Sequence, residues 1–205
     1  FIKYKIFQRN RQSFSQFGED KFIIEYFKNK TKGRYVDLGA FHPFRMNNTY
    51  LLYKKGWTGT NIDFNHISID MFKLVRKRDQ NICSVISDVN NEETKTYFLN
   101  DWSTANSAIF DEKAKIEKEI IMKSKNFENL IKHDFDFLNI DLEGDDYKVL
   151  RSIDFKKFNP KLICIEILQK DRNKEKIFNY MKENKFTFIK QCDVSFFFER
   201  QNEDN

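Results

Sequence analysis

The 205-residue chain has few cysteines and no long apolar run. Cys83, Cys164 and Cys192 are far apart, and no Cys-x-x-Cys pair or His–Cys cluster of the kind that binds zinc occurs. Free, partly buried thiols in a reducing compartment are the simplest interpretation, which predicts a cytoplasmic location. No apolar run approaches the ~20 residues that a membrane-spanning helix needs, so we expect no transmembrane segment.

Linkers and repeats are also missing. No Gly/Ser-rich tract and no internal repeat interrupts the sequence, and its length suits a single core. We therefore expect one domain over residues 1–205, in which residues 1–30 form an N-terminal arm and a covering helix. The chain begins at Phe1 rather than at a methionine, as expected of a portion trimmed from a longer protein.

The net charge is modest. The chain carries 36 basic and 31 acidic side chains, a net charge of +5, and the two signs are interspersed. This pattern indicates a solvated surface rather than a nucleic-acid footprint, so no nucleic acid is expected as a partner. The chain gives no indication of its oligomeric state. Aromatic residues are abundant, with 23 Phe, and we expect phenylalanine to fill much of the core.

Short apolar runs alternate with stretches of helical periodicity. The expected strands span residues 35–38, 59–63, 81–88, 135–141 and 161–166. The expected helices span residues 21–30, 47–55, 67–78, 146–153 and 174–183. This alternation predicts an α/β fold with a parallel sheet. Two closing strands, 186–190 and 194–199, are joined by a connection so short that they must pair antiparallel.

Residues 90–134 interrupt this alternation. Two short strands, over 94–100 and 119–124, are expected there, together with a polar loop that contains Ser103 and Thr104. A polar insertion at the ligand-binding edge is a natural place for substrate contacts. Hydroxyl groups both donate and accept hydrogen bonds, as sugar recognition requires. We therefore expect this insertion, and Ser103 and Thr104 in particular, to contact the acceptor.

Each of the five expected central strands has an acid at or next to its carboxyl end. These acids are Asp37, Asp63, Asp88, Asp141 and Glu166. In a parallel sheet they meet at the edge where open α/β sheets bind ligands. Several buried acids are costly unless cations or hydroxyl groups satisfy them. S-adenosylmethionine offers ribose hydroxyls, an ammonium and a positive sulfur, whereas NAD carries a pyrophosphate and the chain lacks Gly-x-Gly-x-x-Gly. The acids therefore favour S-adenosylmethionine.

Gly39 follows the first of these strands. A glycine is needed there if the backbone must approach a ligand closely. The spacing from Gly39 to Asp63 is close to the ~20 residues expected between a glycine turn and a ribose-binding carboxylate. A generic strand–helix–strand unit with a solvated acid would show the same spacing.

Four stretches together resemble one known family, the FkbM-type methyltransferases. They are Tyr-Val-Asp-Leu-Gly-Ala-Phe-His-Pro (35–43), Asn-Asn-Thr-Tyr (47–50), Leu-Tyr-Lys-Lys-Gly-Trp-Thr-Gly (52–59) and Phe-Leu-Asn-Ile-Asp-Leu-Glu-Gly (137–144). The resemblance runs from about Ser15 to Glu166. It implies a class I, S-adenosylmethionine-dependent enzyme of sugar, polysaccharide or natural-product pathways. The implied fold is a three-layer Rossmann-like sheet, mostly parallel with an antiparallel C-terminal strand. Class I loops usually have two or three glycines, and here only Gly39 remains before Ala40.

By position, the resemblance implies a cofactor site in three parts: the methionine half, the ribose with the adenine ring, and the adenine amino group. The implied residues for the methionine half are Asp37, Gly39 and Ala40. Asp63 would bind the ribose beside Phe64 at the adenine, and Ser87 and Asp88 would border the adenine amino group. Gln16, from the N-terminal segment, would close over the cofactor. Three alternatives stay open. Phe64 is equally suited to the core, Asp88 to a helix cap, and Gln16 with Asp20 to capping the first helix.

A sugar hydroxyl is a poor nucleophile that needs a base or a Lewis acid. The candidates are Asp141, Glu143, Glu166 and His42. Asp141 and Glu166 end adjacent expected strands, as do the carboxylates that hold a divalent metal in some class I O-methyltransferases. Oxygen ligands suit Mg²⁺, Mn²⁺ or Ca²⁺. We favour the metal-free alternative, in which Asp141 holds the methionine ammonium and Glu166 a backbone amide. His42 is also suited to a hydrogen-bonding role in its loop.

The sequence thus predicts an S-adenosylmethionine-dependent O-methyltransferase acting on a hydroxyl of a sugar, glycan or related small molecule. One alternative is RNA methylation, for which the chain lacks a basic stripe. The other is a non-catalytic, cofactor-binding partner subunit, and the complete set of strand-end acids argues against it.

Overall fold

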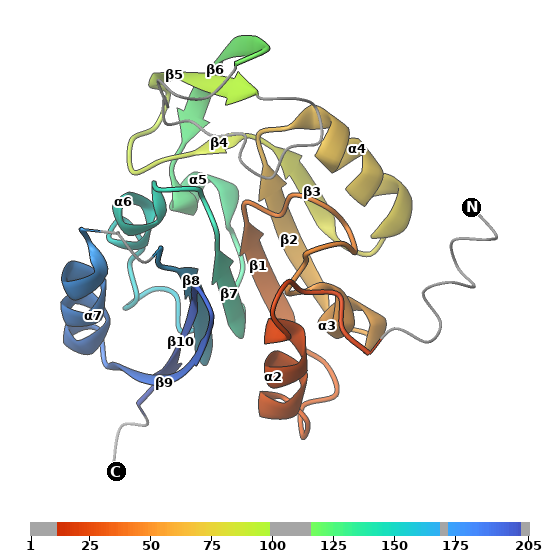
Figure 1. The fold of residues 1–205 in the computed structure, drawn as a ribbon, viewed down its shortest axis with the longest axis vertical. Helices are drawn as coiled ribbons and strands as arrows, with labels where there is room; N and C mark the ends of the chain where they lie inside the picture. The colour runs from red at the N-terminus through yellow and green to blue at the C-terminus, as the bar shows by residue number, and fades with distance from the viewer. Residues whose placement is uncertain (1–11, 99–115, 169–171, 202–205) are drawn as a thin grey trace.

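A seven-stranded sheet forms the centre of the protein (Figure 1). The computed structural model describes residues 12–98, 116–168 and 172–201. The strand order is β3-β2-β1-β7-β8-β10-β9. Their bounds are β1 Arg34–Leu38, β2 Thr58–Asp63, β3 Gln80–Cys83, β7 Phe137–Ile140, β8 Leu162–Glu166, β9 Phe186–Cys192 and β10 Ser195–Arg200. Neighbours from β3 to β8 pair parallel, whereas β10 pairs antiparallel with both β8 and β9.

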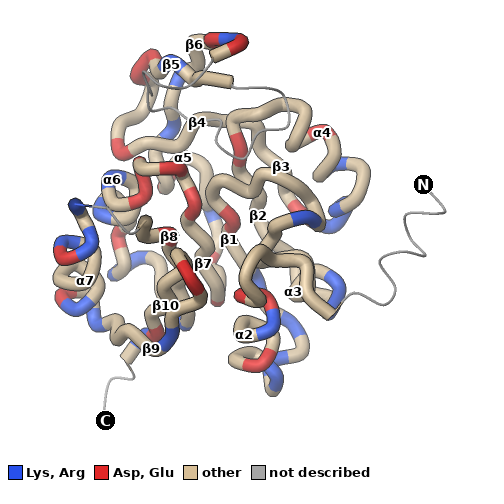
Figure 2. The backbone as a smooth tube through the Cα atoms, in the orientation of Figure 1, with Lys and Arg blue, Asp and Glu red and all other residues tan. Residues whose placement is uncertain are grey.

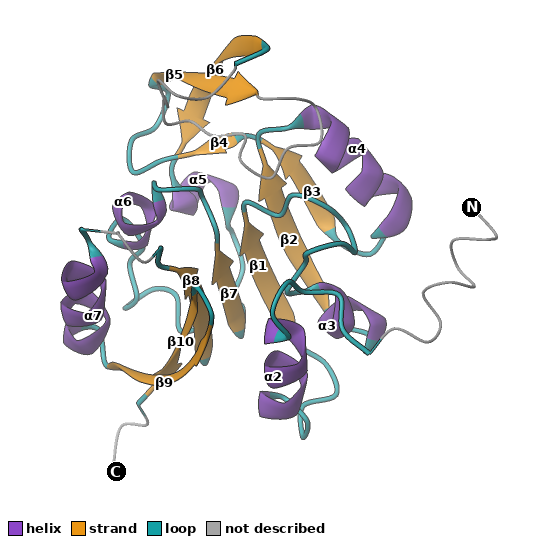
Figure 3. Ribbon diagram, in the orientation of Figure 1, coloured by secondary structure: helices purple, strands orange, loops and turns teal. Residues whose placement is uncertain are grey.

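Helices cover both faces of this sheet, which makes three layers (Figure 3). One face carries α2 (Glu19–Tyr26), α3 (Tyr50–Lys54) and α4 (His66–Val75), and the other carries α5 (Phe127–Leu130), α6 (Asp146–Leu150) and α7 (Lys174–Glu183). The first layer packs through Ile23, Phe27 and Leu52. The second packs through Ile177 and Met181. The predicted α/β, mostly parallel, three-layer fold with antiparallel closing strands is confirmed.

The alternation of side chains along β1 places polar groups on one face. Val36 and Leu38 point into the core beneath α5–α7, so Asp37 points to the opposite face. The parallel register sets Asp37 opposite Asn61 of β2 and Asn139 of β7. A row of buried polar side chains therefore crosses the sheet close to its carboxyl edge.

The single strand expected over residues 81–88 is wrong. Strand β3 ends at Cys83, and β4 (Val85–Ile86) pairs with β6 (Lys118–Lys125) in a separate three-stranded sheet of order β4-β6-β5, where β5 is Glu93–Phe98. The reason is that β2 ends at Asp63, whose carbonyl accepts the last ladder bond, from the Ser84 N–H (3.0 Å). Beyond that point the chain has no partner on β2, so it pairs with β6.

The small sheet lies beyond the carboxyl ends of β2 and β3 (Figure 1). Its strands β5 and β6 belong to the expected 90–134 insertion, whose role in substrate binding stays a prediction. Ser103 and Thr104 lie outside the described residues.

Three further features of the described residues concern helix length, the thiols and the distribution of charge. None of its helices is both long and apolar enough to cross a bilayer. Cys83, Cys164 and Cys192 are free thiols, exposed, buried and half-buried respectively. Basic and acidic residues are both spread along the described backbone (Figure 2).

Candidate functional site

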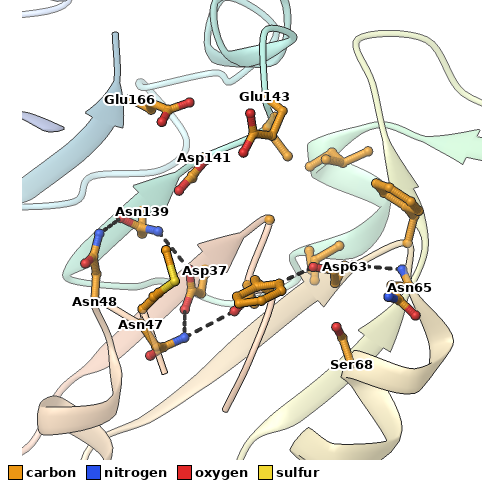
Figure 4. Close-up of a pocket in the computed structure, with 18 of the residues that line it drawn as sticks. Asp37, Asn47, Asn48, Asp63, Asn65, Ser68, Asn139, Asp141, Glu143 and Glu166 are labelled. Carbon is orange, nitrogen blue, oxygen red and sulfur yellow. Dashed lines mark hydrogen bonds between the residues drawn. The ribbon is translucent and has the colours of Figure 1, made fainter. Parts of the chain in front are cut away.

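A cavity opens at the carboxyl edge of the sheet (Figure 4). The loop after β1, the ends of β2, β7 and β8, the first turn of α4 and the segment before α2 all contribute to its wall. Its acidic lining residues are Glu19, Asp37, Asp63, Asp141, Glu143, Asp145 and Glu166. Among the described residues, no lysine, arginine or histidine lines it. The cavity is therefore suited to a cationic or hydroxyl-rich ligand.

Asp37 is the most enclosed of these acids. Its carboxylate accepts a hydrogen bond from Thr49 Oγ1 (2.7 Å). It also accepts from Asn139 Nδ2 (2.9 Å) and Asn47 Nδ2 (3.3 Å), as Figure 4 shows. Burial raises the pKa of Asp37, while the Thr49 hydrogen bond and the charge of Arg76 oppose that rise. A carboxylate has about four lone pairs, so three protein donors leave little capacity for a ligand. Asp37 mainly organises the floor of the cavity.

The loop after β1 needs its glycine for a reason other than the one expected. Gly39 has φ +73°, and a Cβ there would lie 1.7 Å from the backbone carbonyl oxygen of Asp141. The N–H groups of Gly39 and Ala40 both donate to the Ile62 carbonyl (3.0 and 3.1 Å). The close approach is thus to the backbone after β7, and both amides are already used within the sheet edge.

Asp63 ends β2 and lines the cavity. Its two carboxylate oxygens accept from the backbone N–H groups of Asn65 (2.7 Å) and Phe41 (2.8 Å). Burial raises the pKa of Asp63 to about 6, against the effect of these two donors. Phe64, also in the wall, packs edge-on against Phe98 of β5 with ring centroids 5.3 Å apart. An acceptor for hydroxyls therefore lies beside an aromatic wall.

Asp141, Glu143 and Glu166 form an acidic group on the opposite side of the cavity, where their side chains converge (Figure 4). One ligand oxygen from each lies within 4.8 Å of the others. Burial, followed by the charge of Glu166, raises the pKa of Asp141 well above its usual range. Burial and Asp146 likewise raise the pKa of Glu143. Such a group can accept a proton, bind hydroxyls or hold a cation.

His42 lies outside the cavity wall. Its Nδ1 accepts from the backbone N–H groups of Phe44 (3.3 Å) and Arg45 (3.2 Å), which shapes the loop. Burial, with help from the charges of Arg45 and Arg76, lowers the pKa of His42 to about 4. The structure therefore places His42 in the hydrogen-bonding role that the sequence left open beside that of a base.

The two predicted residues for the adenine amino group are not brought to the cavity wall either. Asp88 forms ion pairs with Lys148 (3.3 Å) and Arg151 (3.6 Å), and Ser87 Oγ donates to Asp88 (3.2 Å). Ser84, three residues earlier, lines the cavity instead.

In the segment before α2 and at the start of that helix, Gln16 and Asp20 have different roles. Gln16 lines the cavity. Asp20 does not, because its carboxylate accepts from Ser13 Oγ (2.7 Å), Ser15 Oγ (2.8 Å) and the Phe14 N–H (2.6 Å) and so folds the segment back on itself. Glu19, which sequence reasoning missed, also lines the cavity and accepts from Ser195 Oγ (3.1 Å).

Three further residues of the site were missed. Asn47 and Asn139 lie within stretches that carried the family resemblance, which was a usable signal for both. Arg76 gave no signal, because a cation at the end of an amphipathic helix is ordinarily a solvated residue. In the structure it is fully buried.

Comparisons with known proteins identify the family to which the chain belongs and bear on its fold. The family model described as "Methyltransferase FkbM domain" matches residues 37–188. No curated protein matches. A methyltransferase FkbM from Methylobacillus flagellatus KT has a similar structure, with a TM-score of 0.58 and 14% identity over 82% of this chain and 44% of that one. This chain therefore spans less than half the length of that protein.

A second similar structure is a TehB-like SAM-dependent methyltransferase from Corynebacterium glutamicum ATCC 13032 Kitasato. Its TM-score is 0.51, at 10% identity over 98% of this chain and 94% of that one. At such identities the two structures show the fold alone.

Proposed function

The chain belongs to the FkbM methyltransferase family, and from that premise we propose that it methylates a hydroxyl oxygen of a sugar, glycan or related small molecule. Membership makes it an S-adenosylmethionine-dependent methyltransferase domain. The acceptor class is the part that we propose. The observation that carries it is the group formed by Asp141, Glu143 and Glu166.

The cavity fits the cofactor in charge. S-adenosylmethionine brings a sulfonium and an ammonium to a wall with seven acids and, among the described residues, no base. We assign the ribose hydroxyls to Asp63 and the adenine ring to Phe64. We assign the methionine half to the floor over Asp37, Gly39 and Ala40, with Gln16 closing from the N-terminal segment. Since the N–H groups of Gly39 and Ala40 donate to Ile62, these two residues would shape the floor rather than donate to the ligand.

An acidic group beside the methyl donor suits a hydroxyl acceptor. When bound, S-adenosylmethionine supplies an electrophilic methyl group and leaves as a neutral thioether. The acceptor oxygen would take the methyl group, and Asp141, kept ionised by the positive charge of the ligand, would accept the proton of the hydroxyl. Glu143 and Glu166 would hold neighbouring hydroxyls. Alignment of the two reactants contributes up to ~7–11 kcal/mol, and a carboxylate base a further ~10²–10⁴ in rate.

A divalent metal is the second candidate for the same three carboxylates. Oxygen ligands within 4.8 Å of one another suit Mg²⁺, Mn²⁺ or Ca²⁺. Glu143 adds a third ligand to the Asp141–Glu166 pair that the sequence indicated. We retain a metal-free site, now with Asp141 as the base rather than as the partner of the methionine ammonium, because the cofactor's ammonium and sulfonium already offer positive charge to this wall.

Methyl transfer from labelled S-adenosylmethionine to a panel of sugars, nucleotide-sugars and glycans, read by mass spectrometry, tests the proposal. We expect label on an acceptor oxygen and loss of labelling in Asp141→Asn. Label only on nitrogen, only on carbon or only on RNA would refute the acceptor class. S-adenosylhomocysteine binding without transfer to any class would favour the non-catalytic subunit instead. Ser103 and Thr104 remain the proposed acceptor contacts, tested by their alanine variants through the acceptor's KM.

A further inference from the structure

Arg76 is a fully buried arginine that no step of methyl transfer uses. It follows α4 directly and does not line the cavity. A buried guanidinium is costly unless its donors are satisfied, so its partners show what it holds in place. On one side it forms an ion pair with Asp79 (3.6 Å) and donates to the Tyr35 hydroxyl (3.0 Å). On the other side its donors lead to the loop and helix that follow β1.

The guanidinium reaches three separate points of that segment. Nε donates to the Pro43 carbonyl (3.0 Å). Nη2 donates to Asn47 Oδ1 (2.5 Å), and both Nη1 and Nη2 donate to Thr49 Oγ1 (2.9 and 3.0 Å). Aromatic rings pack around it, including those of Tyr50 and Phe72, with centroids 5.5 and 5.1 Å away.

Because arginine only donates hydrogen bonds, these contacts fix the orientation of both partners. Asn47 must present Oδ1 to Arg76, which turns Nδ2 toward Asp37 (3.3 Å) and the Ala40 carbonyl (3.2 Å) (Figure 4). The Thr49 hydroxyl accepts from Arg76, so its own hydrogen is free to point at Asp37 (2.7 Å). Two of the three donors that Asp37 receives are thus set by one buried cation.

We propose that Arg76 is a positioning residue of the cofactor site, which acts through Asn47 and Thr49 on Asp37 and on the loop from Gly39 to Pro43. This inference rests on the proposed placement of the methionine half over that floor. The charge of Arg76 also opposes the effect of burial on the pKa of Asp37, together with the Thr49 hydrogen bond. Loss of the Arg76 charge or of the Thr49 hydrogen bond would leave Asp37 more readily protonated beneath a positive ligand.

Two substitutions separate this role from a general contribution to stability. Thr49→Val keeps the shape of the side chain and removes only the hydroxyl between Arg76 and Asp37. Asp79→Asn is the matched control, because it weakens the ion pair on the far side of Arg76 and leaves Asn47 and Thr49 untouched. A third variant, Arg76→Lys, retains the charge but is unable to bridge both partners at once.

The measurements are the Kd of S-adenosylhomocysteine, the KM of S-adenosylmethionine, kcat and the Tm. We expect Thr49→Val and Arg76→Lys each to raise Kd and KM by roughly 10-fold, the scale of one hydrogen bond to a charged group, with a smaller change in kcat. The double variant should lose less than the product of the two effects, since both act on Asp37. Asp79→Asn should lower the Tm and leave Kd within about twofold.

Each outcome has one meaning. If the wild-type chain does not bind S-adenosylhomocysteine, the proposed function is wrong. If it binds and Thr49→Val binds equally well, or if Asp79→Asn weakens binding as much at a similar loss of Tm, Arg76 has a structural role only. If Arg76→Lys fails to fold, the comparison of S-adenosylhomocysteine affinity between Thr49→Val and Asp79→Asn still tests the positioning role.

Discussion

At the scale of single residues, three aspartates of one cavity differ because their neighbours differ. Asp37 receives three side-chain donors, Asp63 receives two backbone N–H groups, and Asp141 faces other acids. Hydrogen bonds to the charged form of a carboxylate favour ionisation, and nearby like charges disfavour it. The three are thereby suited to organising the floor, holding hydroxyls and accepting a proton, in that order.

Asp141→Asn should abolish turnover while the cofactor still binds. The substitution keeps the shape and removes the charge, so kcat should fall by ~10²–10⁴, the usual contribution of a general base. Single-turnover assays and calorimetry with S-adenosylhomocysteine measure the two effects separately. If a chelator also abolishes wild-type activity and Mg²⁺ or Mn²⁺ restores it, the metal role replaces the base role. Normal turnover of Asp141→Asn would move the chemistry to Glu143 or Glu166.

Asp63→Ala should weaken cofactor binding by ~1–3 kcal/mol, the scale of hydrogen bonds to a charged acceptor. Because the pKa of Asp63 is raised to about 6, wild-type affinity should also fall as the pH drops below that value and the acceptor is protonated. Calorimetry across this range, with Asp70→Ala as an exposed acidic control on α4, provides the check. A pH-independent affinity in the wild type would remove Asp63 from the site.

Sequence reasoning found the site residues that local pattern marks. Asp37, Asp63 and Glu166 lie at or next to the carboxyl ends of expected strands, and that position predicted that they meet at one edge. Arg76 and its hold on Thr49 were missed because burial and partners depend on contacts between segments far apart in the chain. A residue's type and its place in a periodic stretch carry no information about such contacts.

At the scale of elements, the apolar pattern predicted where strands occur but not which partners they choose. Residues 81–88 were predicted as one strand, yet the strand partner changes at Ser84 because β2 ends at Asp63. The helix expected over residues 47–55 begins only at Tyr50. Asn47 and Thr49, before that point, form hydrogen bonds with Arg76 and Asp37 respectively. These tertiary contacts override the local helix propensity.

Gly39→Ala should damage this edge of the sheet more than ordinary backbone strain does. A left-handed φ costs a non-glycine residue ~1–3 kcal/mol. At Gly39 the added Cβ would also lie 1.7 Å from the Asp141 carbonyl oxygen, a backbone atom with little freedom to move. Gly56→Ala is the matched control, since Gly56 has φ +99° and a Cβ added there would meet no described atom within 4 Å.

Thermal unfolding and S-adenosylhomocysteine affinity distinguish the two glycine variants. Both should lose stability, and only Gly39→Ala should also lose cofactor binding, because the displaced backbone carries Asp141. Equal effects of the two substitutions on affinity would show that the contact between the β1 loop and the end of β7 is unimportant for binding.

At the scale of the whole molecule, the charge is divided between surface and cavity. The chain has a net charge of +5, yet its cavity wall is acidic. Burial raises the pKa values of five of these acids, Asp37, Asp63, Asp141, Glu143 and Asp145, and so opposes their ionisation. A cationic ligand favours the ionised forms, so binding and proton release are coupled.

The stabilisation that the cofactor provides should therefore grow with pH. Burial raises the folded-state pKa values of Asp63 and Asp141, so the folded protein binds more protons than the unfolded chain above the ordinary aspartate range. The free energy of unfolding of the empty protein should accordingly fall as the pH rises through the raised pKa of Asp63, about 6. A ligand that requires ionised acids binds best at a pH above the raised pKa of Asp63, where the protein without ligand is less stable. The increase in Tm caused by S-adenosylmethionine should thus be larger at about pH 8 than at about pH 5. Asp63→Asn does not titrate, so this variant should show a smaller difference between the two pH values. An equal increase in Tm at both pH values in the wild type would show that the acidic wall does not bind the ligand's charge.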